Sequence, residues 1–187
     1  MAHPRASGRF RARPAADTLR AANLPTRGGN TGVNSLANLL HVLFAVIWVG
    51  GMFFAYVILR PVAASTLEAP ERLMLWRRVL AKFFVWVWKS VVIVLLTGYW
   101  LGFGLFSTMG DWPTHVHVMH GLGLIMAGVF LAVYFAPFRH LREAVDTQDW
   151  TRAGSALATV RKLVAVNLVL GIIVVVVASG GRLGMLG

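Results

Sequence analysis

Four long stretches of apolar residues dominate the pattern of hydrophobic and polar positions along this chain. The first, Leu36 to Leu59, contains only Asn38 and His41 as strongly polar side chains. An apolar run of about 20 residues is long enough to cross the hydrocarbon core of a membrane as a helix. The pattern predicts an all-α integral membrane protein, a bundle of four transmembrane helices. The expected spans are residues 35–60, 83–106, 114–138 and 163–181.

The segments between the apolar stretches predict how the spans are connected. We expect the first span to end at Arg60-Pro61, because proline cannot continue the helical hydrogen-bond ladder. Residues 62–82 mix basic and apolar side chains, which suits a short helix that lies at the membrane interface and runs into the second span. In the second span, Gly98 and Gly102 would let a neighbouring backbone approach closely.

Composition supports the membrane assignment and leaves no room for a second folded domain. Hydrophobic residues make up 57% of the 187 residues and charged residues only 13%, whereas about 25% of a typical soluble domain is charged. The formal net charge of +11 would suit nucleic acid, but the basic residues lie in the N-terminal tail and the connections. We therefore expect a lipid bilayer as the partner and no nucleic acid. The chain has no cysteine, so any metal must be bound by His, Met, carboxylate or backbone groups.

Residues 1–33 are predicted to be a disordered, Arg-rich tail, followed by a transmembrane domain over residues 34–187. The tail contains six arginines and no apolar run, and such a segment cannot bury enough apolar surface to fold. It also lacks the apolar core and the cleavage site of a secretory signal. An alternative is that translation begins near Val33, so we assign no function to the tail.

The distribution of Lys and Arg predicts the side of the membrane that each connection faces. The connection between spans two and three carries none. The other two connections carry five each, and basic connections stay in the cytoplasm. We therefore expect both termini to face outward, into the periplasm, although the arginines farther up the tail favour the opposite orientation. The basic residues of the two connections are Arg60, Arg72, Arg77, Arg78 and Lys82, and Arg139, Arg142, Arg152, Arg161 and Lys162.

Three histidines are expected at one depth near the outer face. His41 lies in the first part of span one, and His117 and His120 lie in the first part of span three, which runs parallel to span one. His117 and His120 share one helix face, whereas His115 points elsewhere, closer to water. Histidines on facing helices are how a helix bundle builds a cofactor or metal site. The alternative is that a lone His41 simply hydrogen-bonds across helices.

Two methionines lie close to these histidines in the sequence. Met119 and Met109 would add soft thioether ligands, which suit Cu(I). For Met119, simple packing is the alternative. The sequence gives no catalytic residue, and we expect a non-enzymatic protein unless a haem makes it a membrane oxidoreductase.

A second polar set is expected toward the inner end of the bundle. It consists of Arg60, Lys89 and Asn167. The long side chain of Lys89 can extend to the lipid headgroups. Otherwise Lys89 and Asn167 line a path or bind an anionic group.

Most of the chain after residue 34 resembles the CopD, or copper-resistance D, family of small four-span bacterial membrane proteins. The matching stretches are LHVLFAVIWVGGMFFAYVILRPVAA at 40–64, HVHVMHGLGLIMAGVFLAVYFAPFRHLR at 115–142 and RKLVAVNLVLGIIVVVVASGGR at 161–182. The resemblance implies a location in the bacterial inner membrane and a role in moving or tolerating copper. It also implies a periplasmic copper protein or a redox protein as the kind of partner to expect.

A more distant similarity is to HemJ-type protoporphyrinogen oxidases, four-span proteins that bind haem b. His41, Trp48, Gly51 and Arg60 match the spacing of their first helix, and His117 matches the histidine of their Trp-x-His-x-Lys motif. Met119 stands at the position of that lysine. The similarity therefore implies haem binding through His41 rather than oxidase activity.

Three functions from different classes follow. The first is copper handling, with His41, His117 and His120 as ligands and Met119 as a further candidate. The second is a haem-b redox protein that uses His41 and one histidine of span three as axial ligands. The third is an assembly or scaffold protein without a cofactor, in which the histidines are structural.

Overall fold

The computed structural model describes residues 31–182, and over these residues the chain is helical with no strand. Four of its segments are long and apolar enough to cross a membrane, so the predicted all-α bundle of four transmembrane helices is confirmed for the described part of the chain. The expectation for the tail lies outside the described residues, except that Thr31, Gly32 and Val33 belong to the first helix. In order, the elements are α2 (Thr31–Phe53), the π-helix η1 (Phe54–Leu59), α3 (Arg60–Thr66), α4 (Ala69–Leu105), the 3-10 helix η2 (Met109–Asp111), α5 (Thr114–Phe135), α6 (Pro137–Asp146) and α7 (Trp150–Arg182).

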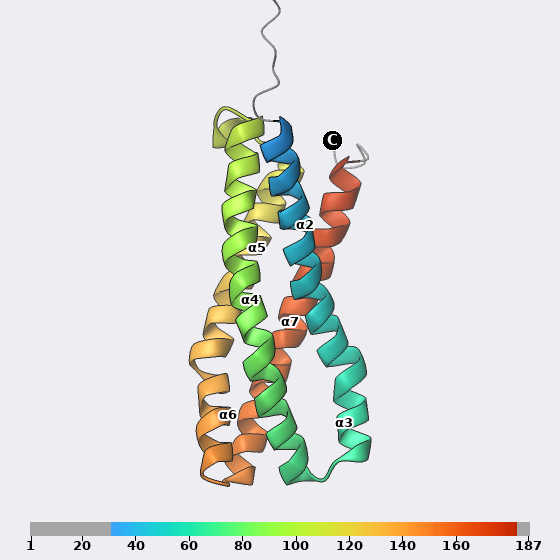
Figure 1. Ribbon diagram of the computed structural model, residues 1–187, viewed down its shortest axis with the longest axis vertical. Helices are drawn as coiled ribbons and strands as arrows, with labels where there is room; N and C mark the ends of the chain where they lie inside the picture. The colour runs from blue at the N-terminus through green and yellow to red at the C-terminus, as the bar shows by residue number, and fades with distance from the viewer. Residues whose placement is uncertain (1–30, 183–187) are drawn as a thin grey trace, which may run out of the picture. The chain divides into compact units, whose positions relative to one another are not determined.

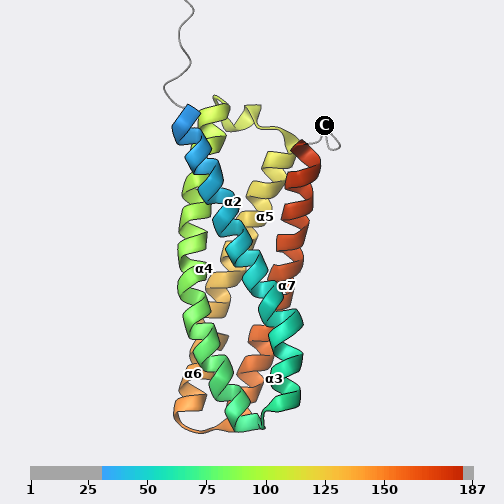
Figure 2. The ribbon, with the colours of Figure 1, turned by 45° about the vertical axis from the view of Figure 1, so that its right-hand side comes forward.

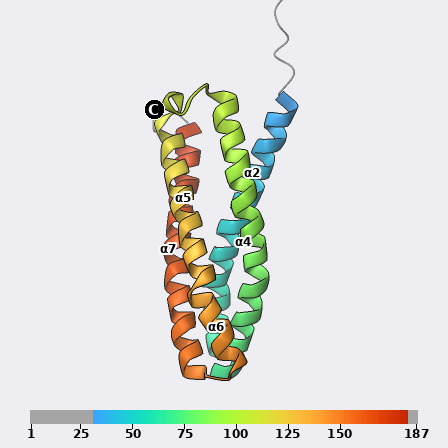
Figure 3. The same cartoon turned by 90° about the vertical axis from the view of Figure 1, so that its left-hand side faces the viewer.

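The helices of the bundle alternate in direction, so that α2 and α5 run parallel to each other and opposite to α4 and α7 (Figure 1). The connections α3–α4 and α6–α7 lie together at one end of the bundle, which we call the basic end (Figure 3). The start of α2, the α4–α5 connection and the last turns of α7 lie at the other end (Figure 2). We call this the histidine end, because His41, His115, His117 and His120 belong to it.

The sequence predicts that the first helix ends at Arg60-Pro61, but in the structure the helix does not end there. It continues through the π-helix η1 into α3 and reaches Thr66. The backbone N–H of Arg60 donates to the carbonyl of Ala55, five residues earlier, which is the π-helical spacing. Pro61 has no N–H to donate, and the wider turn before it lets the chain continue without that hydrogen bond.

The start of α4 also differs from its prediction. Residues 69–82 are not a separate helix at the membrane interface but the first turns of a continuous helix that runs to Leu105 (Figure 1). Leu73, Trp76 and Leu80 recur at helical spacing and are all buried in the core. This buried stripe packs inside the bundle, so the segment stands upright beside α6 and α7 rather than lying flat.

Aromatic side chains fill the centre of the bundle. Phe84 of α4 and Phe130 of α5 pack edge to face, with ring centroids 5.6 Å apart. Trp48 of α2 and Trp88 of α4 also pack on the ring of Phe130. Most other large apolar side chains of α2 face outward, among them Leu39, Val46 and Phe53, and such a surface is suited to lipid.

The third span changes direction where its sequence predicts that the helix leaves the membrane. Ala136 departs from helical geometry, and Pro137 then begins α6. On α6, Arg139 pairs with Glu143 at 2.9 Å, while Asp146 pairs with Arg77 of α4 at 2.6 Å. The pair between Asp146 and Arg77 joins α6 to α4 at the basic end, whereas the pair between Arg139 and Glu143 lies within α6.

Candidate functional site

His41 of α2 faces α4 at the histidine end. Its Nδ1 lies 3.0 Å from Oγ1 of Thr97. The Thr97 hydroxyl donates its one hydrogen to the carbonyl of Ile93, at 2.5 Å. When the Thr97 hydroxyl gives its hydrogen to Ile93, Nδ1 of His41 is the donor to Thr97, and Nε2 carries the lone pair. Metal-binding histidines are commonly held in this way, with one ring N–H donated and the other nitrogen open.

His117 and His120 form a pair on one face of α5, as their spacing predicts. Both rings lie beside the indole of Trp112, with centroids 5.8 Å and 5.5 Å from it. Nε2 of His120 also lies 2.9 Å from the hydroxyl of Tyr99 on α4. When that Nε2–H donates to Tyr99, Nδ1 of His120 is left with its lone pair. His117 is exposed and His120 is half-buried.

Trp112 contacts both the pair on α5 and the last turns of α4. Residues four apart on a helix share one face and lie one turn from each other. His41 contacts Thr97 and Gly98, Trp112 contacts Gly102, and His120 contacts Tyr99, so the indole meets the same face of α4 as His41, one turn farther along the helix. Within residues 31–181, no three His, Asp or Glu side chains are grouped closely enough to hold one metal ion together.

The two glycines of α4 have a different role from the one that their spacing predicts. They admit side chains rather than a neighbouring backbone. A Cβ atom at Gly98 would lie 3.1 Å from the His41 ring, and one at Gly102 would overlap the indole of Trp112. The glycines thus make room for the two aromatic rings at the histidine end.

His115 and Met119 lie apart from this arrangement. The His115 ring packs against Gly181 near the end of α7, so closely that a Cβ atom there would overlap it. This contact takes His115 toward a different helix from the one that His120 touches. Met119 is half-buried on α5, and Met109 is exposed in η2. The backbone carbonyl of Met109 accepts a hydrogen bond from the backbone N–H of Trp112, at 3.2 Å.

The expected polar set at the other end has three separate environments. Arg60 lies over the ring of Tyr56 at 5.0 Å, and Lys89 lies over the ring of Trp86 at 4.5 Å. Asn167 is buried in the core, where its Nδ2 lies 3.7 Å from Sδ of Met52. Its Oδ1 has no hydrogen-bond partner among the described residues.

A family model described as Copper resistance protein D, or CopD, matches residues 77–180, more than half of the chain. The chain belongs to the CopD family. The matched CopD region includes His117, His120 and Trp112, whereas His41 and Arg60 precede it. No curated protein and no solved structure was found to match.

The sequence did not single out the side chains that hold the histidines. Thr97 and Tyr99 are ordinary residues of a membrane helix, and only their helical offset from Gly98 and Gly102 links them to the site. Trp112 precedes α5, where an indole is expected at the membrane interface, yet it is only 6% exposed. A tryptophan placed just before a histidine-rich helix start is the signal that could have drawn attention to it.

Proposed function

We propose that this CopD-family protein handles copper within the membrane and binds the ion through imidazoles at the histidine end. The observation that carries the proposal is the hydrogen bond between His41 and Thr97, which leaves Nε2 of His41 open to a ligand. Family membership supports copper as that ligand. Copper is here the cargo of the protein, and no catalytic residue is part of the proposal.

The chemistry of the donors agrees with this cargo. Imidazole nitrogen and thioether sulfur both suit copper, and thioether favours Cu(I). His117 and His120 on α5 offer two imidazoles that can converge on one ion, and exposed His117 gives access from outside. His41 offers a third imidazole from α2. Met119 remains a further candidate, which would need a rotation of its flexible side chain.

The direction of the bundle in the membrane is part of the proposal. Ten Lys and Arg residues belong to the connections at the basic end, which favours the cytoplasmic side of a bacterial inner membrane for that end. The histidine end then faces the periplasm. Copper would enter there from a periplasmic partner.

Copper binding by single variants tests the proposal. The full chain, purified in detergent, is titrated with Cu(I) against a colorimetric chelator, and the visible spectrum is recorded before and after loading. We expect His117→Ala, His120→Ala and His41→Ala each to lose most of the bound copper, and Met119→Leu to lose less. His140→Ala is the matched control, because His140 is exposed on α6 at the basic end, and it should bind as the wild type does.

Three results would contradict the proposal. Equal copper binding by all variants would mean that the histidine end is not the site. A Soret band in the wild type, lost in His41→Ala, would favour a haem-b protein. A wild type that takes up neither copper nor haem would favour a scaffold without a cofactor.

A further inference from the structure

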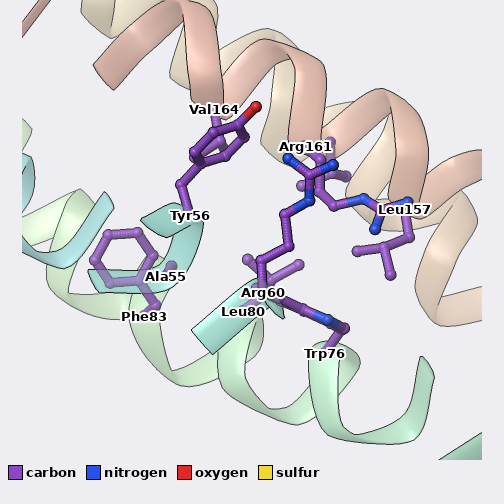
Figure 4. A pocket seen from close by; sticks show the side chains of 10 residues that line it. Ala55, Tyr56, Arg60, Trp76, Leu80, Phe83, Leu157, Arg161 and Val164 are labelled. Atoms are coloured by element: carbon purple, nitrogen blue, oxygen red, sulfur yellow. The ribbon is translucent and has the colours of Figure 1, made fainter. Parts of the chain in front are cut away.

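A hollow at the basic end carries two arginines from different helices. It lies between the π-helix with the start of α3, the first turns of α4, and α7. Figure 4 shows the guanidinium of Arg60, from α3, extending toward Arg161 of α7. The side chains around them are apolar or aromatic, among them Trp76, Leu157 and Val164. Two arginines thus line a hollow whose walls are otherwise apolar or aromatic.

Neither arginine is neutralised by a carboxylate within the described residues. The ion pairs there use Arg77, Arg139 and Arg152 instead. Arg72 adds a third positive charge, because it lies close enough to repel Arg161 electrostatically, as Arg60 does. Two guanidinium groups that lie close together in a partly apolar hollow repel each other, and an anion between them removes that repulsion.

The π-helix gives this hollow its shape. Ala55 and Tyr56 of η1 line it, and Arg60 is the residue whose backbone makes the π-type hydrogen bond to Ala55. The extra residue in that turn rotates Arg60 relative to the preceding α-helix, and Tyr56 then supports its guanidinium at 5.0 Å. Single π-turns inside α-helices are frequent at functional sites.

We propose that this hollow binds the phosphate group of an anionic phospholipid. Planar guanidinium groups bind phosphate oxygens in pairs of hydrogen bonds, and here two arginines line one hollow. The apolar walls favour a phosphate that brings acyl chains over a free ion. In the proposed orientation the hollow lies toward the cytoplasmic side, where basic pockets between transmembrane helices are suited to anionic headgroups. The site lies at the opposite end of the bundle from the histidines and is independent of copper.

Retention of lipid by the intact protein tests this site. The full chain in detergent is mixed with phosphatidylglycerol or phosphatidylcholine, and the lipid that remains bound is counted by native mass spectrometry. We expect phosphatidylglycerol to be retained by the wild type in preference to phosphatidylcholine. Arg60→Gln and Arg161→Gln should each weaken retention about fivefold, the effect of one basic residue near an anionic surface. Arg161→Lys keeps the charge but loses the paired hydrogen bonds, so its lipid retention should lie between that of the wild type and that of Arg161→Gln.

Arg142→Gln is the matched control. Arg142 is an exposed arginine at the same end of the bundle, its guanidinium lies over Phe138, and it does not line the hollow. Its removal should leave retention unchanged. Circular dichroism shows whether Arg60→Gln and Arg161→Gln are correctly folded. If the folded variants retain as much phosphatidylglycerol as the wild type does, the proposal is overturned. Displacement of the lipid by millimolar inorganic phosphate would show that the site binds a free anion rather than a phospholipid.

Discussion

At the scale of single residues, the histidine end depends on one hydroxyl group. Thr97 donates its hydrogen to the backbone of its own helix and accepts a hydrogen bond from His41 on α2. In this arrangement Thr97 holds one tautomer of His41 and joins α2 to α4 at the same time. The sequence predicts His41 as a candidate ligand, with a hydrogen bond across helices as the alternative. It does not identify Thr97 as the partner of the ring, because the rotation of one helix about its axis relative to another is set by packing and not by apolar periodicity.

We expect Thr97→Val to destabilise the protein by about 0.6 kcal/mol, the average for a side-chain hydrogen bond between membrane helices. Valine keeps the shape of threonine and removes the acceptor for His41. The matched control is Thr159→Val, because Thr159 donates to the carbonyl of Ser155 in the same way but is exposed and has no histidine partner. Unfolding in mixed micelles by a denaturing detergent measures both. Equal stability of the two variants would show that the contact between His41 and Thr97 contributes nothing.

At the scale of elements, the sequence predicted the four spanning helices correctly. It did not predict where the first helix ends or how α4 begins. Apolar length alone identifies a spanning helix, because an unpaired backbone cannot be tolerated in lipid. The same pattern does not distinguish an interfacial helix from an upright one at residues 69–82, because Leu73, Trp76 and Leu80 form an apolar stripe in either case. The π-helix before Pro61 was not predicted, since its extra residue depends on how Arg60 and Tyr56 pack in the folded bundle.

The contact between the first helix and α4 predicts a difference between two adjacent glycines. A Cβ atom at Gly51 would overlap the ring of Phe83, whereas one at Gly50 would meet nothing within 4 Å. We expect Gly51→Ala to lower the free energy of unfolding by about 1–3 kcal/mol, the usual cost of overpacking a core. Gly50→Ala is the control and should be neutral or slightly stabilising, because alanine favours a helix over glycine. The detergent-unfolding measurement should separate them, and a Gly51→Ala protein as stable as Gly50→Ala would mean that α2 does not pack on Phe83.

At the scale of the whole molecule, the bundle has two chemically different ends. One end gathers four histidines, and the other gathers ten Lys and Arg residues of the two connections. The sequence predicted this division, because connection charge and span direction are both visible in it. It did not predict that Arg60 and Arg161 would line one hollow, because they lie in different connections far apart in the chain, or that Trp112 would pack against the pair on α5.

The division of charge predicts the orientation of the protein in the membrane. A reporter that is active only in the periplasm should be active when fused after Gly110, in the connection without Lys or Arg. The same reporter should be silent when fused after Asp149, between α6 and α7. Fusion activity normalised to protein level is the measurement. The opposite pattern would mean that the arginines of the N-terminal tail set the orientation.

The central claim is that copper is bound by imidazoles at the histidine end, and copper K-edge X-ray absorption tests it most directly. The full chain loaded with Cu(I) should show nitrogen neighbours together with the outer-shell scattering that marks imidazole rings. The double variant His117→Ala/His120→Ala, loaded at equal protein concentration, should lose most of that imidazole signal. Copper that shows no imidazole scattering in the wild type, or the same imidazole scattering in the double variant, would contradict the assignment.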